Sequence, residues 1–262
     1  ELAGRHAAHP GGRNRGVMSL VDMGIANVLY ELNDLENART HILRGLELIP
    51  LWGAADDLVL AYTTHARIQQ AQGNKAGAEE AIEKGIQLIQ TRGVFSSARD
   101  AVRTAQVKLW LAQGDLLSAD RWAASQEERL ISDRGFRFEN ELTRITLSRV
   151  YIAQKKPDET IKLLTRLEES AESDERTGRL IEILLLEALA MQGIGDSEHA
   201  ILALTKCLTL AEPEGYMRIF LDEGEPMCEL LERMKTSSLT PQLEEYVIRL
   251  LEAGTAESMA GD

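Results

Sequence analysis

The apolar residues of this chain follow a helical spacing that is interrupted by a tight turn about every forty residues. Successive turn residues are separated by 40, 41, 41 and 40 positions, and a small residue follows each of them four places later. The turn residues are Asp34, Asn74, Asp115, Lys156 and Asp196, and the small residues are Ala38, Ala78, Ala119, Thr160 and Ala200. A period of this length, with an apolar helix on each side of the turn, predicts helical hairpins that stack on one another.

Five such hairpins are predicted over residues 17–211. Their approximate bounds are 17–49, 56–90, 97–131, 138–171 and 176–211. In the first hairpin, the first helix carries one helical stripe of apolar residues that we expect to face the core. This stripe comprises Leu20, Ile25, Val28, Leu29 and Leu32.

The pattern changes at both ends of the repeats. Residues 1–16 are polar, Gly-rich and basic, and we expect a flexible lead-in or the remnant of a preceding repeat. Residues 212–253 predict short helices broken at Gly224 and a last amphipathic helix, which would cap the apolar face of the final hairpin. Residues 254–262 are interpreted as a disordered tail or linker.

The turns and small residues resemble tetratricopeptide repeats in a version with a longer period. The positions that carry this resemblance in the first hairpin are Ile25, Ala26, Leu29, Ala38, Gly45 and Pro50. The resemblance implies an all-α fold in which tetratricopeptide-like hairpins form a right-handed superhelix, an α-solenoid.

A second resemblance covers nearly the whole chain. Residues 27–53, 109–124, 142–154 and especially 210–231 are similar to the helical-repeat region of the MalT-like activators, the large ATP-binding regulators of the LuxR group. That family implies a nucleotide-binding switch domain before the repeats, a superhelix that senses an inducer, and a LuxR-type helix-turn-helix after it. The implied partners are a small-molecule inducer or regulatory protein and the flanking ATPase and DNA-binding domains.

Two parts of that family pattern are missing here. No GxxxxGK[ST] phosphate loop occurs, so ATP binding is not carried over and no cofactor is expected. The sequence also stops where the helix-turn-helix would begin. Since it starts at Glu1 without a Met, we interpret it as a piece of a longer protein that retains the sensor or interaction module.

Composition narrows the function classes further. The formal net charge of −13 disfavours direct binding of nucleic acid by this segment. The two cysteines have no CxxC spacing and indicate a reducing, cytoplasmic setting. No run of 18 apolar residues is present, so no membrane association is expected.

One candidate binding surface follows from the repeat register. The residue seven places before the turn residue is Arg67, Lys108 and Arg149 in three successive hairpins. Stacked repeats would align these cations on the concave face, where they would attract an anionic effector or an acidic partner segment. The predicted effector or partner site comprises Asn27, Tyr30, Arg67, Gln70, Lys108, Arg149 and Gln192.

An alternative interpretation of the same cations is that they form ion pairs with acidic residues of adjacent helices. At the level of function, the first hypothesis is a non-catalytic effector- or partner-binding sensor module of a bacterial LuxR-type regulator. The alternative is a protein–protein interaction scaffold that binds an extended peptide in its concave groove. An enzyme is not expected, because no GxSxG, HExxH or CxxC motif occurs.

A few other residues invite a chemical role. Tyr216, Arg218, Asp222 and Glu223 look like a catalytic cluster, but a capping turn with a local ion pair at Arg218 explains them equally well. We therefore interpret them as structural or as a contact surface for the DNA-binding domain. The scattered histidines have no metal-ligand spacing, so no metal site is predicted.

Overall fold

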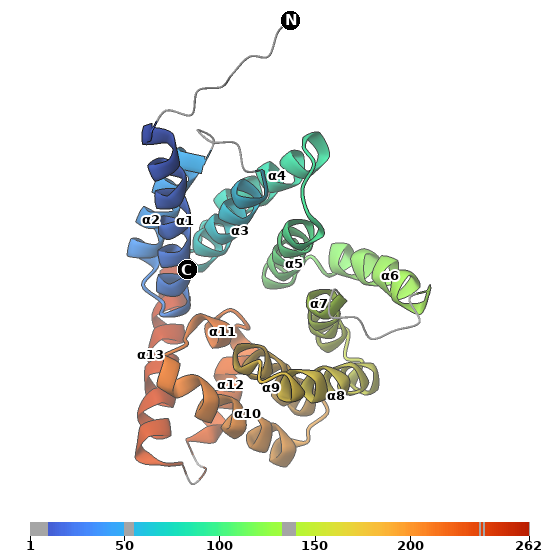
Figure 1. The fold of residues 1–262 in the computed structure, drawn as a ribbon. Helices are drawn as coiled ribbons and strands as arrows, with labels where there is room; N and C mark the ends of the chain where they lie inside the picture. The colour runs from blue at the N-terminus through green and yellow to red at the C-terminus, as the bar shows by residue number, and fades with distance from the viewer. Residues whose placement is uncertain (1–9, 50–54, 133–139, 236, 238, 262) are drawn as a thin grey trace, which may run out of the picture. The chain divides into compact units, whose positions relative to one another are not determined.

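The structure is a computed structural model that describes residues 10–49, 55–132, 140–235, 237 and 239–261. Within these ranges the chain is helical and contains no strand, and consecutive helices form antiparallel pairs (Figure 1). The chain divides into two units, residues 1–105 and residues 106–262, with the boundary inside α5 (Ser96–Gln113). The predicted all-α class built from helical hairpins is confirmed.

The first unit contains two complete hairpins and the beginning of α5. One hairpin pairs α1 (Pro10–Glu31) with α2 (Leu35–Leu48), and the other pairs α3 (Ala55–Ala71) with α4 (Lys75–Thr91). Their shared core is small and largely aliphatic, so the helices approach closely. It comprises Met23, Ala26, Tyr30, Ala38, Ile42, Ile49, Leu58, Ala61 and Ile68.

The second unit contains the rest of the repeats and the C-terminal helices. The repeat helices are α6 (Leu116–Ser132), α7 (Glu141–Ala153), α8 (Pro157–Ser173), α9 (Thr177–Gly193) and α10 (Ser197–Ala211). After a 3-10 turn (Glu212–Glu214) come α11 (Arg218–Leu221), α12 (Glu225–Met234) and α13 (Pro241–Gly261).

The turns within the hairpins are built as the sequence predicts. Each one bends at a residue with positive φ, a conformation that glycine adopts without steric cost. These residues are Asn33 (64°), Gly73 (78°), Gly114 (79°), Lys155 (57°) and Gly195 (81°). The next residue directly precedes the second helix, and in four of the five turns its side chain accepts a hydrogen bond from the N–H three positions later. These capping residues are Asp34, Asn74, Asp115 and Asp196.

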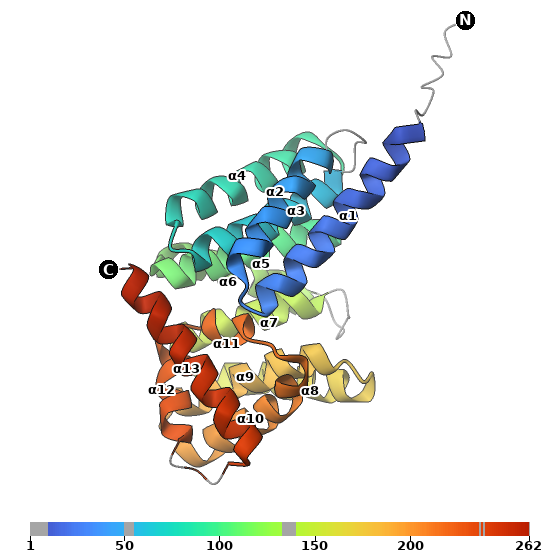
Figure 2. The same ribbon diagram turned by 90° about the vertical axis from the view of Figure 1, so that its left-hand side faces the viewer.

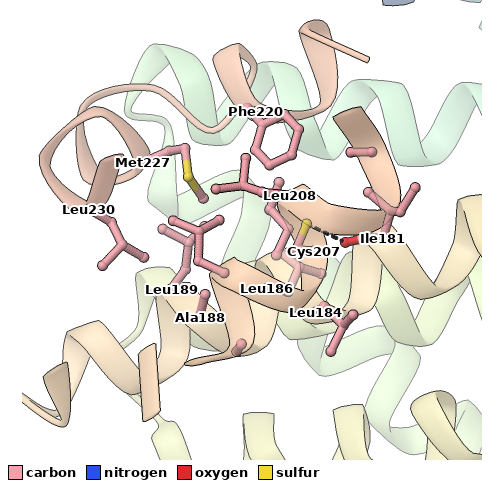
Figure 3. Close-up of a cluster of buried hydrophobic side chains, with 14 of the residues drawn as sticks. Ile181, Leu184, Leu186, Ala188, Leu189, Cys207, Leu208, Phe220, Met227 and Leu230 are labelled. Atoms are coloured by element: carbon pink, nitrogen blue, oxygen red, sulfur yellow. Dashed lines mark hydrogen bonds between the residues drawn. The ribbon is translucent and has the colours of Figure 1, made fainter. Parts of the chain in front are cut away.

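The C-terminal helices pack against the last hairpin. Figure 3 shows Phe220, Met227 and Leu230 pointing into the same cluster as Leu208 of α10 and Leu189 of α9. Burying this face removes the exposed apolar end that an uncapped repeat array would have. The buried thiol of Cys207 donates a hydrogen bond to the Ile181 carbonyl within the same cluster.

The last helix is longer than the sequence predicts. Residues 254–261 were expected to be a disordered tail, but α13 continues to Gly261. Gly254 lies so close to α12 that a Cβ there would stand 3.1 Å from Cys228 Sγ. Glu257, one turn further on, forms an ion pair with Arg218. The extra turns are therefore held by contacts with α11 and α12 that no local pattern reveals.

The first helix also differs from its prediction. It begins at Pro10, inside the expected lead-in of residues 1–16, and residues 1–9 of that lead-in lie outside the described residues. Its core face carries Ser19, Asp22, Met23, Ala26 and Tyr30, which are all buried. Of the predicted stripe, Leu29 is partly buried and packs against this core, whereas the other four residues do not. Leu20, Ile25, Val28 and Leu32 are exposed.

Candidate functional site

Arg149 of α7 is a buried cation held between two carboxylates. Its Nε donates to Glu223 Oε1 at 2.9 Å, and its Nη2 lies 2.8 Å from the same oxygen and 3.0 Å from Glu182 Oε1. Glu182 belongs to α9, and Glu223 belongs to the turn between α11 and α12. Arg149 therefore joins the repeat helices to the C-terminal helices within the second unit.

Further charged side chains extend this contact. Lys108 Nζ of α5 lies 3.7 Å from Glu182 Oε1, which is the longest of these ion pairs. Arg179 pairs with Glu182 and places its Nε 3.2 Å from Glu141 Oε2, and Arg176 pairs with Glu141 as well. We name these residues the inner ion network. It comprises Lys108, Glu141, Arg149, Arg176, Arg179, Glu182 and Glu223.

Electrostatics keep the buried members of this network charged. Burial alone would raise the pKa of Glu182, but Arg149, Lys108 and Arg179 outweigh it and lower this pKa far below its ordinary value. Burial opposes the charge of Arg149 too, yet Glu223 and Glu182 raise its pKa overall. A carboxylate that stays ionised beside several cations is poorly suited to proton transfer near neutral pH. The contacts of the network therefore join α7, α9 and the turn between α11 and α12 through ion pairs.

Arg67 of α3 has its own partners within the first unit. Its Nη2 donates to Glu31 Oε1 at 2.7 Å, and its guanidinium carbon lies 4.2 Å from the centroid of the Tyr30 ring. Tyr30 is almost completely buried, so it is a packing surface for Arg67. Asn27 Nδ2 donates to the Met23 carbonyl, and its Oδ1 accepts from Thr64 Oγ1, each at 3.0 Å.

The two predicted glutamines lie in different units. Gln70 is half-buried on α3 of the first unit. Gln192 Nε2 of α9 lies 3.4 Å from Glu229 Oε2 of α12 in the second unit. The contact between Gln192 and Glu229 also links the last repeat to the C-terminal helices.

The predicted basic positions are therefore paired with acidic residues at all three places. Lys108 and Arg149 meet at Glu182 in the second unit, and Arg67 pairs with Glu31 in the first. This arrangement agrees with the alternative interpretation, in which the three cations form ion pairs with acidic residues of the chain itself. An anionic ligand at these positions would have to displace or share carboxylates of the chain itself.

Sequence analysis named Glu223 only as part of an apparent catalytic cluster, and it did not connect Glu141, Glu182 or Glu223 with the basic positions. Glu182 stands within the otherwise apolar run from Leu180 to Leu186, and a lone carboxylate in such a run signals a buried ion pair. Glu223 gave no comparable signal, because its partner lies 74 positions earlier. The local ion pair predicted for Arg218 is present, with Asp222 as its acceptor.

A shallow hollow lies elsewhere, between α3 and α4 of the first unit. It has a volume of about 290 Å³ and is open to solvent, which places it at the small end of ligand pockets. It is lined by Leu58, Tyr62, Lys84, Gln87, Leu88 and Thr91. None of the predicted site residues contributes to it.

Other candidate chemistry has little support in the described part of the chain. No group of three His, Cys, Asp or Glu side chains there could hold a metal ion. Trp110 and Trp122 pack against a hydrophobic cluster of the second unit. None of the helices described is both long and apolar enough to span a membrane.

Comparison with known proteins identifies a family. The model of the MalT-like TPR region matches residues 2–237, which extends through α12 and ends before α13. No match was found among curated proteins.

Proposed function

The chain belongs to the family of MalT-like TPR regions, and we propose that it is the effector- or partner-binding sensor module of a bacterial LuxR-type transcription regulator. In this proposal the module is non-catalytic. The ATPase and DNA-binding activities of the regulator would reside in flanking domains, and the net charge of −13 disfavours a direct role in nucleic-acid binding.

One observation carries the proposal beyond family membership. Arg149 contacts Glu182 of α9 and Glu223 of the turn between α11 and α12, so the same side chain connects repeats and C-terminal helices. A ligand that changes the pairing of Glu182 would alter the contact that holds this turn. The inner ion network thus provides a physical link between a binding event on the repeats and the C-terminal end.

Lys108 is the member of the network best placed to receive a ligand. Its side chain is 28% exposed, and its Nζ lies farther from the Glu182 carboxylate than the paired nitrogens of Arg149 and Arg179 do. Arg179 is exposed to a similar degree, whereas Arg149 is almost completely buried. A carboxylate or phosphate group could share Lys108 and Arg179 with Glu182 through charge-assisted hydrogen bonds.

The test is a thermal-shift screen against sugars, phosphorylated metabolites, nucleotides and small organic acids. Wild type would be compared with Lys108→Gln and with the control Lys235→Gln, which removes an exposed lysine paired with Glu232. We expect an anionic compound to raise the Tm of wild type and control but not of Lys108→Gln. Arg149 is unsuitable for this test because replacing it is expected to destabilise the folded chain and so lower the Tm without any ligand.

The outcomes distinguish the two functional hypotheses. If no small molecule shifts the Tm but acidic peptides bind and lose affinity with Lys108→Gln, the peptide scaffold replaces the effector sensor. If a compound stabilises Lys108→Gln as strongly as wild type, the inner ion network is not the binding site.

A further inference from the structure

A series of side-chain hydrogen bonds runs from the start of α4 back along α3, which lies beside both α2 and α4 (Figure 2). The N–H of Gly77 donates to Asn74 Oδ1 at 3.1 Å, and Asn74 Nδ2 donates to Gln69 Oε1 at 2.7 Å. Gln69 Nε2 in turn lies 2.9 Å from Nε2 of His65. We name these four residues the amide chain. It connects the N-terminal cap of α4 to an imidazole on α3.

The direction of every bond in the amide chain is fixed at its capping end. A backbone N–H can only donate, so the Asn74 atom that meets Gly77 must be its oxygen. The Asn74 atom that meets Gln69 is then its NH2 group, and the Gln69 atom that meets His65 is an NH2 group as well. Because an NH2 group only donates, Nε2 of His65 must accept. The amide chain therefore holds His65 in its neutral form, with the proton on Nδ1.

The turn itself does not require this arrangement. In three of the other hairpins the capping residue is an aspartate, which accepts the same N–H but has no N–H of its own to continue a chain. The positions equivalent to Gln69 in the other hairpins are occupied by apolar or aromatic residues, namely Leu29, Trp110, Tyr151 and Met191. The amide and the imidazole are thus an addition to the second hairpin that its fold does not explain.

The amide chain is closely packed against the first turn of α4. A Cβ at Gly77 would collide with the Asn74 amide and would lie 3.1 Å from Gln69 Oε1. The missing side chain at this position is therefore what allows the two amides to meet. Gln69 is only 9% exposed, so water is a poor substitute for its partners. A bond lost from the chain leaves a polar group without a partner at a cost in stability.

Protonation of His65 is incompatible with the complete chain. The protonated imidazole donates from both nitrogens, so its Nε2–H would face the NH2 group of Gln69. Turning the Gln69 amide over brings its NH2 group against the NH2 group of Asn74. Turning Asn74 over as well brings an NH2 group against the N–H of Gly77. Each rearrangement moves the mismatch along the chain, so one bond must break.

The surroundings of His65 favour the same neutral form. Burial lowers its pKa most, Arg39 of α2 and Lys84 of α4 lower it further, and Glu80 of α4 acts in the opposite direction. Glu80 forms an ion pair with Lys84 at 2.7 Å. The pKa of His65 in the folded chain is therefore below its ordinary value of 6.5. The resulting stability is fully present above pH 6.5 and decreases as the pH falls from 6.5 toward the folded pKa.

We propose that His65 is a proton-sensitive contact of the second hairpin, at which uptake of one proton on Nε2 breaks the amide chain and loosens the turn between α3 and α4. All four residues of the chain belong to α3, to α4 or to this turn, so the change begins within the first unit. The inference does not depend on the effector proposal, because the inner ion network belongs to the second unit.

Nitrogen-15 NMR of the imidazole side chains of the full chain, recorded from about pH 8 to about pH 5, tests the proposal. The His65 signals are identified by their absence in His65→Gln. We expect a proton on Nδ1 and none on Nε2 at neutral pH, and a titration midpoint below 6.5. A proton on Nε2 at neutral pH, or a midpoint at or above 6.5, overturns the proposal.

Gln69→Glu should reverse the response. A carboxylate accepts from the Asn74 amide and from a protonated imidazole, so every bond of the chain survives protonation. The midpoint of His65 should therefore rise above 6.5 in this variant. Gln90→Glu is the matched control, because it adds the same charge at an exposed position near the end of α4 and should move the midpoint little. A midpoint that stays below 6.5 in Gln69→Glu contradicts the assigned bond directions.

A stability measurement separates a broken chain from a shifted titration without structural effect. Between about pH 7.5 and about pH 5.5, the Tm of wild type should fall by about 2 °C more than the Tm of His65→Gln. The amide oxygen of the new glutamine can accept from Gln69 at every pH, so that variant keeps the chain. The Tm of Gln69→Glu should fall less than that of wild type. Equal losses in wild type and His65→Gln would show that protonation of His65 leaves the turn intact.

Discussion

The guanidinium of Arg149 lies 2.8 Å from a carboxylate oxygen of Glu223, a residue 74 positions later in the chain. The same guanidinium reaches Glu182 at 3.0 Å. Both carboxylates are largely buried, with 11% of the Glu182 side chain and 13% of the Glu223 side chain exposed. The position of the turn between α11 and α12 therefore depends on a cation that belongs to the fourth hairpin.

Replacing Arg149 by Met should destabilise the chain by about 3–5 kcal/mol, because it leaves two buried carboxylates without their main counter-charge. Urea unfolding followed by circular dichroism measures the loss. Arg121→Met, at an exposed position of α6, is the control and should change stability little. Adding Glu182→Gln and Glu223→Gln to Arg149→Met should recover part of the loss. No recovery would mean that packing, not charge, is the role of Arg149.

The stability supplied by Glu182 should vanish in acid. Its pKa is lower in the folded chain than its ordinary value of 4.5, so the folded state favours the ionised form. The contribution is fully present above pH 4.5 and decreases as the pH falls from 4.5 toward the folded pKa. Glu182→Gln should therefore cost most stability at neutral pH, and the difference from wild type should shrink in that acidic window.

Glu187 lies on the same helix as Glu182, and its pKa is shifted in the opposite direction, so it is a suitable control. Burial and the nearby Glu168 raise its pKa, so its ionised form weakens the folded state. Glu187→Gln should stabilise the chain at neutral pH, and this gain should disappear as the pH falls through the raised pKa toward 4.5. Urea unfolding at several pH values measures both variants. If the two glutamates respond in the same direction, the charge balance assigned to the inner ion network is wrong.

The small residues after the turns should tolerate no charge. Ala119 is completely buried between the helices of its hairpin, and its equivalents Ala38, Ala78, Thr160 and Ala200 are completely buried too. Ala119→Glu should cost about 2–5 kcal/mol, since the carboxylate must displace close packing and lose its hydration. The control Leu117→Glu is two residues away and largely exposed. Equal melting temperatures for the two variants would contradict the repeat register.

The repeat register could be predicted because it depends on local signals. A positive-φ turn and a small residue recur a few positions apart in each hairpin, and a capping Asp or Asn stands between them in four of the five. A local signal of the same kind begins α13, where the Thr240 hydroxyl accepts a hydrogen bond from the Leu243 N–H and Pro241 is the first helical residue. Such features can be recognised in the sequence without knowing which helices pack against one another.

The sequence-based predictions differ from the structure where contacts between helices distant in the sequence determine the conformation. The apolar pattern of α1 does not reveal which of its two sides meets α2, so the stripe from Leu20 to Leu32 was assigned to the core. The end of α13 depends on Cys228 and Arg218, which belong to other helices. The basic positions were recognised from their period, but their acidic partners Glu31, Glu182 and Glu223 follow no shared period.

The turn at Lys155 should be strained relative to the glycine turns. Lys155 has φ of 57°, in the region where a side chain other than glycine normally costs about 1 kcal/mol. Lys155→Gly should therefore stabilise the chain by up to about 1 kcal/mol, although the greater freedom of glycine in the unfolded chain offsets part of this gain. Urea unfolding measures the change. Asn33→Gly is the matched comparison at φ 64°, and its gain should be smaller because Asn tolerates this conformation better. Gly114→Ala, at φ 79°, should have the opposite effect. A loss of stability in Lys155→Gly would show that the lysine side chain contributes more to this turn than its backbone conformation costs.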